Sequence, residues 1–573
     1  MLDRWSGEDA YDPRSAATAT GTLARFNAAG VLSAADVHVA ERVCGIVGDH
    51  DEDVRLALAL TVRAIRHGSV CLRLEELERD ADVTWPADGW LAKVEASEAV
   101  RQGAIVVDGG AIYLARFHRE ETTIRDDLVA RIAPAAEPEA AALEAADRIF
   151  GPGFEEQRAA ALAAAAQSTT VITGGPGTGK TTTVAGLLAL LLSIDPAARV
   201  ALAAPTGKAA ARLQESIEQS SSRLQPADAQ KLVGLTASTL HRLLGTLPGT
   251  SRFRHNRLNP LPHDVVIIDE TSMVSLTQMS QLLEAVRPST RLILVGDPDQ
   301  LASVEAGAVL ADLVDGLSIL QPGAVQRLTT THRFGGDVGE LARAVREGDL
   351  DGVATVLARG GDAVLIDDSD VSAMNHLRRD LVSRAGLIRQ AAVAEDPVEA
   401  LARSDQHRLL CAHRDGPQGA GWWNRQIERG LSEATGEPIG PGWGREWYAG
   451  RPILVTSNDY GLGLFNGDTG VACLQGDTLR VRVGERDLAP SRMTQVETVH
   501  AMTVHKSQGS QAGMITVVLP EADSPLATRE LIYTAVTRAQ EKVRLVGSRQ
   551  ALEAAIARPV RRASGLARRL SLD

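Results

Sequence analysis

The residues best suited to chemistry lie at positions 174–181, where the sequence reads Gly-Gly-Pro-Gly-Thr-Gly-Lys-Thr. This spacing fits G-x-x-x-x-G-K-[S/T], a loop whose backbone N–H groups surround the phosphates of a nucleotide. We expect Lys180 to reach the β- and γ-phosphates and the Thr181 hydroxyl to hold Mg²⁺. The apolar run before the loop and the helical run after it favour this interpretation over a glycine-rich turn without a ligand. The stretch therefore predicts a site for a nucleoside triphosphate with Mg²⁺.

A glutamine upstream of the loop is a second candidate for nucleotide binding. The Gln157 side chain offers both a donor and an acceptor, which suits the edge of an adenine ring, although a glutamine before a helix means little by itself. The predicted nucleotide-binding residues are Gln157, Gly174, Gly175, Pro176, Gly177, Thr178, Gly179, Lys180, Thr181 and Thr182.

Two carboxylates and an amide follow later apolar runs. Asp269 and Glu270 come directly after the run 265–268, and Gln300 lies shortly after the run 292–295. We expect Asp269 to belong to the Mg²⁺ site and Glu270 to activate the attacking water. Gln300 is a candidate sensor of the γ-phosphate. An Asp-Glu pair alone is a common surface dipeptide, so its place behind an apolar strand decides the interpretation.

Strands and helices must alternate to bring these groups together. The runs at 169–173, 200–204, 265–268 and 292–295 read as buried strands separated by helices, and each is followed by polar residues. This order predicts a parallel α/β sheet with the site along the carboxyl edge of its strands. Apolar runs predict a second sheet in the C-terminal half, at 409–412, 452–455, 514–519 and 543–546.

Length and composition exclude several classes. The 573 residues suffice for three to four domains, and 44% hydrophobic content supports sizeable cores. The net charge of −13 argues against a protein coated in positive potential, although a narrow nucleic-acid channel needs only a local cluster of donors. The four cysteines lack metal-ligand spacing, which favours a reducing, cytoplasmic environment. We expect no signal peptide and no membrane segment.

The ordered motif set resembles the superfamily-one DNA helicases, and more narrowly the RecD family, the alpha subunits of exodeoxyribonuclease V. Each motif alone is moderate evidence, whereas the complete order along about 400 residues is specific. The stretches that carry the resemblance are Gln157, 174–181, 204–210, 238–245, 268–273, 296–301, 328–334, 503–510 and 533–539.

The resemblance implies two RecA-like P-loop motor domains with ATP in the cleft between them. Arg333 and Arg538 would enter as arginine fingers from the second domain, so that Lys180, Asp269, Glu270, Gln300, Arg333 and Arg538 form the expected catalytic set, with Thr181 and Asp269 at Mg²⁺. It also implies 5′→3′ movement on DNA. The residues in motifs that face single-stranded DNA are Thr206, Lys208, Thr239, His241, His505 and Lys506, for each of which a helix cap or a surface charge is the alternative.

The same resemblance divides the chain. Residues 1–130 are expected to form a mainly helical domain that docks on a RecC-like subunit, and 131–325 the first motor domain with a small hairpin insertion at 246–263. Residues 326–573 are expected to form the second motor domain with an SH3-like β insertion at 443–496. A RecB-like subunit would supply nuclease activity, because no nuclease motif is present here.

Three alternatives remain open. The alternatives are a stand-alone RecD-like helicase, a regulatory scaffold subunit with a weak ATPase, and an RNA helicase with the same motor chemistry. One departure from the family pattern is also present. Gln511 follows 507–510 where relatives commonly carry a glutamate that contacts ribose or DNA, so the strength of that one contact is in question.

Overall fold

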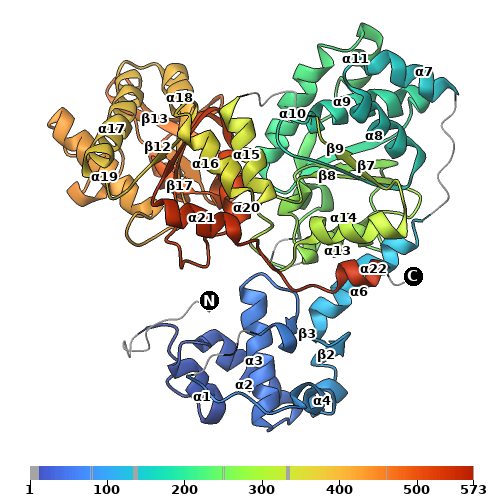
Figure 1. Cartoon of the computed structure of the whole chain (residues 1–573). Coiled ribbons are helices and arrows are strands. Elements are labelled where there is room, and N and C mark those ends of the chain that lie inside the picture. Colours follow the sequence, from blue (N-terminus) through green and yellow to red (C-terminus); the bar gives the residue numbers. More distant parts are fainter. Residues whose placement is uncertain are drawn as a thin grey trace.

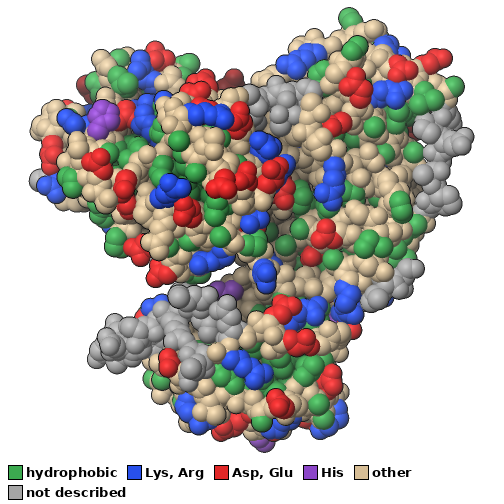
Figure 2. Space-filling model, in the orientation of Figure 1, with side chains coloured by type: hydrophobic (Ala, Val, Ile, Leu, Met, Phe, Trp, Pro, Cys, Tyr) green, Lys and Arg blue, Asp and Glu red, His purple; other side chains and the backbone are tan. Residues whose placement is uncertain are grey.

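The computed structural model describes residues 12–571 except 78, 80, 81, 133–139, 248, 251, 331–335 and 460. A small N-terminal domain and two larger α/β domains surround a central junction (Figure 1). Basic and acidic side chains are interspersed on the face seen in Figure 2, which also shows a hollow where the second α/β domain stands off the N-terminal domain. None of the described helices is long and apolar enough to cross a membrane.

The N-terminal domain is mainly helical, as predicted. A β-hairpin joins Ile105–Asp108 to Ala111–Leu114 through two glycines that both have positive φ, which is the geometry of a tight hairpin turn. Asp51 precedes α3 (Glu52–Arg66) and caps it by accepting hydrogen bonds from the Asp53 and Val54 amides. The acidic residues 51–53 therefore stand at a helix N-terminus. Its elements are α1 (Gly21–Ala28), α2 (Ala34–Val47), α3 (Glu52–Arg66), β1 (Leu72–Arg73), α4 (Trp90–Glu95), α5 (Glu98–Arg101), β2 (Ile105–Asp108), β3 (Ala111–Leu114) and α6 (Ala115–Val129).

The first α/β domain contains a six-stranded parallel sheet in the order β6-β5-β7-β8-β4-β9. Neighbouring residues of a strand pack into different cores, because helices cover both faces: Val266 packs with α13 and α14, and Ile267 packs with α9 and α10. This explains the continuous apolar strands. The strands are β4 (Thr169–Gly174), β5 (Val200–Ala204), β6 (Ala237–Thr239), β7 (Val265–Ile268), β8 (Arg291–Gly296) and β9 (Val325–Leu328). The helices are α7 (Ala140–Ile149), α8 (Glu155–Ala166), α9 (Lys180–Ile194), α10 (Gly207–Ser221), α11 (Pro226–Leu232), α12 (Leu240–Leu244), α13 (Leu276–Ala285) and α14 (Val309–Leu320).

The second α/β domain repeats the design with a five-stranded parallel sheet in the order β10-β19-β18-β11-β17. Helices α15, α16, α20 and α21 pack on one face, and α17 and α19 on the other. Its strands are β10 (Ala363–Ile366), β11 (His407–Cys411), β17 (Ala501–Thr503), β18 (Ala512–Val518) and β19 (Ala539–Val546). Its helices are α15 (Asp337–Glu347), α16 (Leu350–Ala358), α17 (Val371–Val393), α18 (Pro397–Gln406), α19 (Ala420–Thr435), α20 (Arg529–Val536) and α21 (Arg549–Ala557).

A five-stranded antiparallel sheet, in the order β15-β14-β13-β12-β16, is inserted between β11 and β17. It corrects one expectation: residues 452–455 form β12 of this inserted sheet and not a strand of the parallel sheet. The run is apolar because Ile453 and Val455 fill the insertion's own core. The SH3-like arrangement of the insertion stays a prediction. The strands are β12 (Pro452–Val455), β13 (Thr469–Gln475), β14 (Thr478–Val483), β15 (Arg486–Leu488) and β16 (Val496–Thr498).

The chain's C-terminal segment does not stay with the second α/β domain, which differs from the expected range 326–573. Helix α22 (Leu566–Ser571) packs between α14 of the first α/β domain and α6 of the N-terminal domain (Figure 1). The contact is close, because a Cβ atom at Gly316 of α14 would lie 2.6 Å from the Leu570 Cβ. Arg562, ahead of α22, donates hydrogen bonds to the carbonyl oxygens of Ser303, Glu305 and Gly307. The segment therefore ties the three domains together.

A hairpin also leaves the first α/β domain near its expected place. Antiparallel bridges pair Thr246 with Phe253 and Asn256 with Asn259, and we call residues 246–259 the hairpin. Arg257 holds it to the N-terminal domain through a two-bond ion pair with Asp127.

Candidate active site

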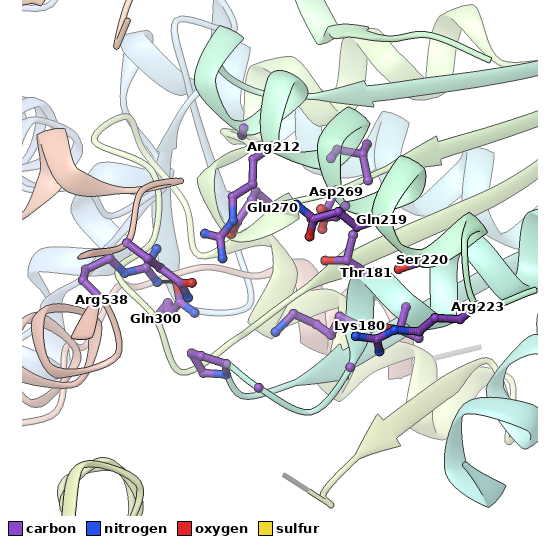
Figure 3. A pocket seen from close by; sticks show the side chains of 18 residues that line it. Lys180, Thr181, Arg212, Gln219, Ser220, Arg223, Asp269, Glu270, Gln300 and Arg538 are labelled. Atoms are coloured by element: carbon purple, nitrogen blue, oxygen red, sulfur yellow. Dashed lines mark hydrogen bonds between the residues drawn. The ribbon is translucent and has the colours of Figure 1, made fainter. Parts of the chain in front are cut away.

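A cavity of about 300 Å³ lies at the carboxyl ends of β4 and β7 (Figure 3). One wall is the glycine-rich loop, another is α10, and Arg538 of the second α/β domain lies beside Gln300 at one end of the cavity. Of the predicted nucleotide-binding and catalytic residues, those that line it are Pro176, Gly177, Gly179, Lys180, Thr181, Thr182, Asp269, Glu270, Gln300 and Arg538.

The glycine-rich loop has the backbone geometry that encloses phosphate. Gly177 and Gly179 have φ of 83° and 82°, a region that side chains disfavour, and α9 begins at Lys180. The loop's amides and the positive end of α9 therefore point toward the same space. The Lys180 Nζ donates to the carbonyl oxygens of Gly174 at 2.5 Å and Gly175 at 3.0 Å, so the ammonium is held over the loop.

Three predicted loop residues lie outside this cavity. Gly174 is needed for packing, since a Cβ there would lie 2.5 Å from the Thr178 hydroxyl and 2.8 Å from a backbone oxygen. The Thr178 hydroxyl donates to the Gly175 carbonyl at 2.8 Å and so braces the loop. Gly175 and Thr178 line a second cavity of about 360 Å³ on the other side of the loop, facing Tyr533 and α15.

Gln157 supports the loop from behind. Its side chain is only 1% exposed, and its amide nitrogen donates to the Thr178 carbonyl at 3.0 Å. This bond fixes the loop between its glycines. The predicted contact with adenine stays a prediction, because Gln157 lines neither cavity.

The acidic pair ends strand β7 at the floor of the cavity. The Glu270 amide donates to Asp269 Oδ1 at 2.8 Å, and Glu270 takes a left-handed backbone conformation with φ of 51°. Burial raises the pKa of Asp269, the adjacent Glu270 carboxylate raises it further, and the charge of Lys180 opposes both. A bound cation would stabilise the ionised form of Asp269 and so oppose this rise in its pKa. Thr181 and Asp269 line the same cavity and supply the hard oxygen ligands that Mg²⁺ prefers beside phosphate oxygens.

Arg538 reaches the cavity at the end of a network that crosses between the two α/β domains. Its Nη2 donates to Gln300 Oε1 at 2.6 Å, and the Gln300 amide donates to Asp297 Oδ2 at 2.9 Å. The Tyr533 hydroxyl donates to the same carboxylate at 3.1 Å. Arg538 is only 2% exposed, so burial lowers its pKa while the Glu270 carboxylate opposes that shift. The cation is thus held at the cavity that Lys180, Asp269 and Glu270 also line.

The residue after Gln300 reinforces this contact. Leu301 belongs to the first α/β domain in sequence, yet its side chain packs into the hydrophobic core of the second. Its amide donates to the Thr534 hydroxyl at 2.8 Å, and its carbonyl accepts from the Gln508 amide at 2.9 Å. A movement of Gln300 is therefore coupled to a movement of the second domain. Arg333, the other predicted finger, lies outside the described residues.

Comparison with known proteins shows the family. Three family descriptions match regions of the chain: the N-terminal domain of RecBCD enzyme subunit RecD over residues 28–113, an AAA domain over 157–306, and a UvrD-like helicase C-terminal domain over 498–546. The chain is 54% identical over 552 residues to RecBCD enzyme subunit RecD of Mycolicibacterium smegmatis, covering 94% of this chain and 98% of that protein. The chain belongs to the RecD family. The RecD subunit of Mycobacterium tuberculosis H37Rv is 52% identical over 575 residues, covering 97% of this chain and 98% of that protein.

Two further relatives are more distant. The ATP-dependent RecD2 DNA helicase of Deinococcus radiodurans is 32% identical over 409 residues, covering 70% of this chain and 50% of that protein. Among solved structures, Bacteroides Pif1 bound to single-stranded DNA has 18% identity and a TM-score of 0.38, covering 69% of this chain and 92% of that chain. That score is too low to bear on function.

Two of the predicted DNA-facing residues of this RecD-family chain cap helices. The Thr206 hydroxyl accepts from the Ala209 amide at 3.2 Å and begins α10, and the Thr239 hydroxyl accepts from the Arg242 amide at 3.1 Å and begins α12. His241 follows in α12, with its ring 5.6 Å from that of Phe253. The caps place these side chains at the carboxyl ends of β5 and β6, and their contacts with DNA stay predictions.

The other three lie at the junction of the domains. Lys208 faces the loop 465–468 of the inserted sheet, and burial lowers its pKa to about 8, with the charge of Arg408 adding to the shift. His505 is partly buried, and this burial lowers its pKa. Lys506 forms an ion pair with Glu497 of β16. All three therefore have their charge reduced or partnered in this arrangement.

The structure adds a polar face of α10 that the motif comparison did not assign. Arg212, Ser216, Gln219 and Ser220 project from it into the cavity opposite the glycine-rich loop, and Arg223 follows just beyond the helix (Figure 3). Their spacing of about one or two helical turns is the signal that identifies this face. Gln511, where the sequence departs from the family pattern, also lines the cavity.

Proposed function

We propose that this RecD-family chain is an ATP-driven DNA helicase subunit that moves 5′→3′ along single-stranded DNA, assembled with RecB- and RecC-like subunits at duplex ends. One observation carries the motor assignment. Lys180, Asp269 and Glu270 of one domain and Arg538 of the other line the same cavity, and a hydrogen bond joins Arg538 to Gln300 across the domains. The near-complete coverage of two RecD subunits supports the assembly.

Each residue has a role that its position allows. The loop amides and Lys180 bind the β- and γ-phosphates. Thr181 and Asp269 would hold Mg²⁺, which would supply positive charge beside the phosphates. Glu270 takes the proton of the attacking water. Arg538 stabilises the negative charge that develops on the γ-phosphoryl group, since its fork stays charged even when buried.

Hydrolysis is coupled to movement through the contact between the domains. ATP bridges the glycine-rich loop and Arg538, and so favours the closed cleft, while loss of the γ-phosphate removes that bridge. Gln300 and Leu301 transmit the change, because one contacts Arg538 and the other packs in the second domain's core. DNA held by the two domains in turn would then be moved in steps.

The test uses the complete complex with its partner subunits. Unwinding and DNA-stimulated ATP hydrolysis are measured on duplexes with 5′ or 3′ single-stranded tails. Because Lys180 is expected to contact the transferred phosphate, Lys180→Gln should lower turnover by this subunit at least about a hundredfold. Lys231→Gln is the matched control, since Lys231 lies in the same domain and binds Asp228 and Ser193 away from the cavity. Unwinding by the Lys180→Gln complex at the wild-type rate would contradict the proposal.

The remaining functions give different outcomes in the same assays. A stand-alone helicase would unwind 5′-tailed duplex without co-purifying subunits, but the chain covers only half of the RecD2 helicase it resembles. A scaffold with a vestigial site would show no DNA-stimulated turnover. An RNA helicase would be stimulated more by single-stranded RNA than by DNA.

A further inference from the structure

A groove outside the nucleotide cleft lies between the N-terminal domain and the hairpin. Its volume is about 720 Å³, more than twice the 300 Å³ of the nucleotide cavity. One wall comes from the N-terminal domain, at the end of α3 and the start of α6. The other comes from α12, α13 and the described hairpin residues. No residue of this groove belongs to the ATP site.

The groove's lining combines positive charge with aromatic rings. It contains Arg66, Arg116 and Arg252 against a single acidic residue, Glu305, although the chain as a whole carries a net charge of −13. Arg66 is neutralised by a two-bond ion pair with the buried Asp36. Arg116 also forms an ion pair, with Glu120, but its side chain is 64% exposed, so the positive charge available in the groove comes from Arg252 and in part from Arg116.

These two arginines are accessible. The Arg116 side chain is 64% exposed, and besides an ion pair with Glu120 it donates to the Thr277 hydroxyl of α13 at 3.1 Å. The Arg252 side chain forms no ion pair or hydrogen bond with a described residue and is exposed on the hairpin. Two guanidinium groups thus flank the groove from opposite walls.

Aromatic rings lie on both walls of the groove. The Arg116 guanidinium lies 5.6 Å from the centre of the Phe117 ring, and on the hairpin side the His241 and Phe253 rings meet edge to face at 5.6 Å. All three rings line the groove. Positive charge that follows a backbone, together with rings on which bases stack, is the combination that binds single-stranded nucleic acid without sequence preference.

We propose that this groove binds single-stranded DNA, so that the N-terminal domain forms one wall of the strand's path. The inference rests on the proposed function, because it extends the predicted DNA face. That face already includes Thr239 and His241 of one short segment, and His241 also lines the groove. A strand that contacts this segment continues between the hairpin and the N-terminal domain.

The experiment compares strands of two lengths on the full chain in its complex. A short oligonucleotide of roughly 8 nucleotides occupies only the α/β domains, whereas one of roughly 20 also reaches the groove. The test variant combines Arg116→Glu and Arg252→Glu. The matched control is Arg101→Glu, because Arg101 of the same N-terminal domain is 63% exposed and pairs with Glu98 on its own helix, much as Arg116 pairs with Glu120.

Binding of the long strand should weaken about tenfold in the double variant, and its logarithmic salt slope should fall by about 1.4 for two lost phosphate contacts. Binding of the short strand and the behaviour of the control should not change. Photoreactive bases placed along the long strand should crosslink to the groove in the wild type alone. ATP turnover without DNA reports whether the double variant is folded.

Equal loss of short- and long-strand binding, or no loss of either, would overturn the groove assignment. Unchanged DNA binding with loss of a partner subunit would overturn it as well and identify a protein-docking surface. A wild-type complex with no DNA-stimulated ATP turnover would instead overturn the proposed function. These results are distinguishable, because turnover with the short strand depends only on the motor.

Discussion

The two sides of the nucleotide cleft are built in different ways. The side in the first α/β domain consists largely of backbone: loop amides, two glycines with positive φ and the start of α9. Among the described residues, the side in the second domain consists of side chains: Gln511 and the buried Arg538, which is held by Gln300 and by the Thr534 carbonyl. The first side exists without the second domain, whereas Arg538 reaches the cavity only through contact between domains.

This difference separates binding from hydrolysis. A backbone cradle contacts phosphate in any position of the second domain, so it determines affinity for the nucleotide. A side chain that arrives with a moving domain contributes only when the cleft is closed, so it determines the rate. The Leu301 side chain connects the two, because it belongs to the first domain but packs in the core of the second.

Replacement of Arg538 should have the largest effect on this division. In Arg538→Ala, ATP turnover should fall by about 10³, because the charge on the γ-phosphoryl group loses its cation. The dissociation constant for ATP should change by less than about tenfold, since the loop and Lys180 remain. Single-turnover hydrolysis and equilibrium nucleotide binding on the complex measure the two quantities separately.

Arg538→Lys is the matched variant, because it keeps the charge but loses the planar fork that bonds Gln300. Its turnover should lie between the wild type and Arg538→Ala. If nucleotide affinity fell as much as turnover in either variant, both sides of the cleft would contribute to binding and the contrast would be wrong.

Gln300 should have a smaller effect because it acts through Arg538. Gln300→Ala removes the acceptor of the 2.6 Å hydrogen bond and leaves the buried guanidinium without it, so DNA-stimulated turnover should fall about tenfold. A double-mutant cycle with Arg538→Ala should show a coupling of about 1–2 kcal/mol in the activation free energy. Additive effects of the two changes would mean that Gln300 senses the γ-phosphate independently of Arg538.

The same contrast between a locally built side and a side built by contact between domains explains which features the sequence predicts. The loop at 174–181 and the Asp269-Glu270 pair depend on a few adjacent residues, so short motifs locate them, and the apolar strands predict the parallel sheets that the structure confirms. Long-range packing is less accessible. The run 452–455 has the composition of a buried parallel strand, although it lies within the range 443–496 expected for the insertion. Its pairing with 469–471 and 496–498 places it in the inserted antiparallel sheet.

Helix α22 shows the same limit at the chain's end. Its residues give no indication that they pack against Gly316, which is some 250 positions earlier in the sequence. The α10 face is an intermediate case, since helical spacing reveals the polar stripe from Arg212 to Ser220, but only the fold turns that stripe toward the cavity. Local chemistry is thus readable from the motifs themselves. The entry of Arg538 into the other domain's cavity is expected only through the family resemblance, and the packing of α22 is not indicated at all.

Lys208, a second lysine of the first α/β domain, has a lowered pKa, so the affinity for DNA should depend on pH. Lys180 is held by the loop carbonyls, whereas Lys208 is partly buried at the contact with the inserted sheet, and this burial lowers its pKa to about 8. Its charge is present below pH 8 and is lost as the pH rises through that value. Phosphate favours the charged form, so affinity for single-stranded DNA should fall by about fivefold between pH 7 and pH 9.5 if Lys208 contacts the backbone.

Arginine at this position stays charged across the whole range, so Lys208→Arg should abolish the decrease, while Lys506→Arg, at a partly buried ion pair with Glu497, should retain it. Fluorescence anisotropy with a labelled oligonucleotide at constant ionic strength measures both. The stability of the contact between α10 and the inserted sheet should change in the opposite direction and rise with pH. An unfolded lysine keeps its proton to about pH 10.4, so the packed arrangement gains stability between pH 8 and that value. An identical pH profile in the wild type and Lys208→Arg would exclude Lys208 from the strand's path.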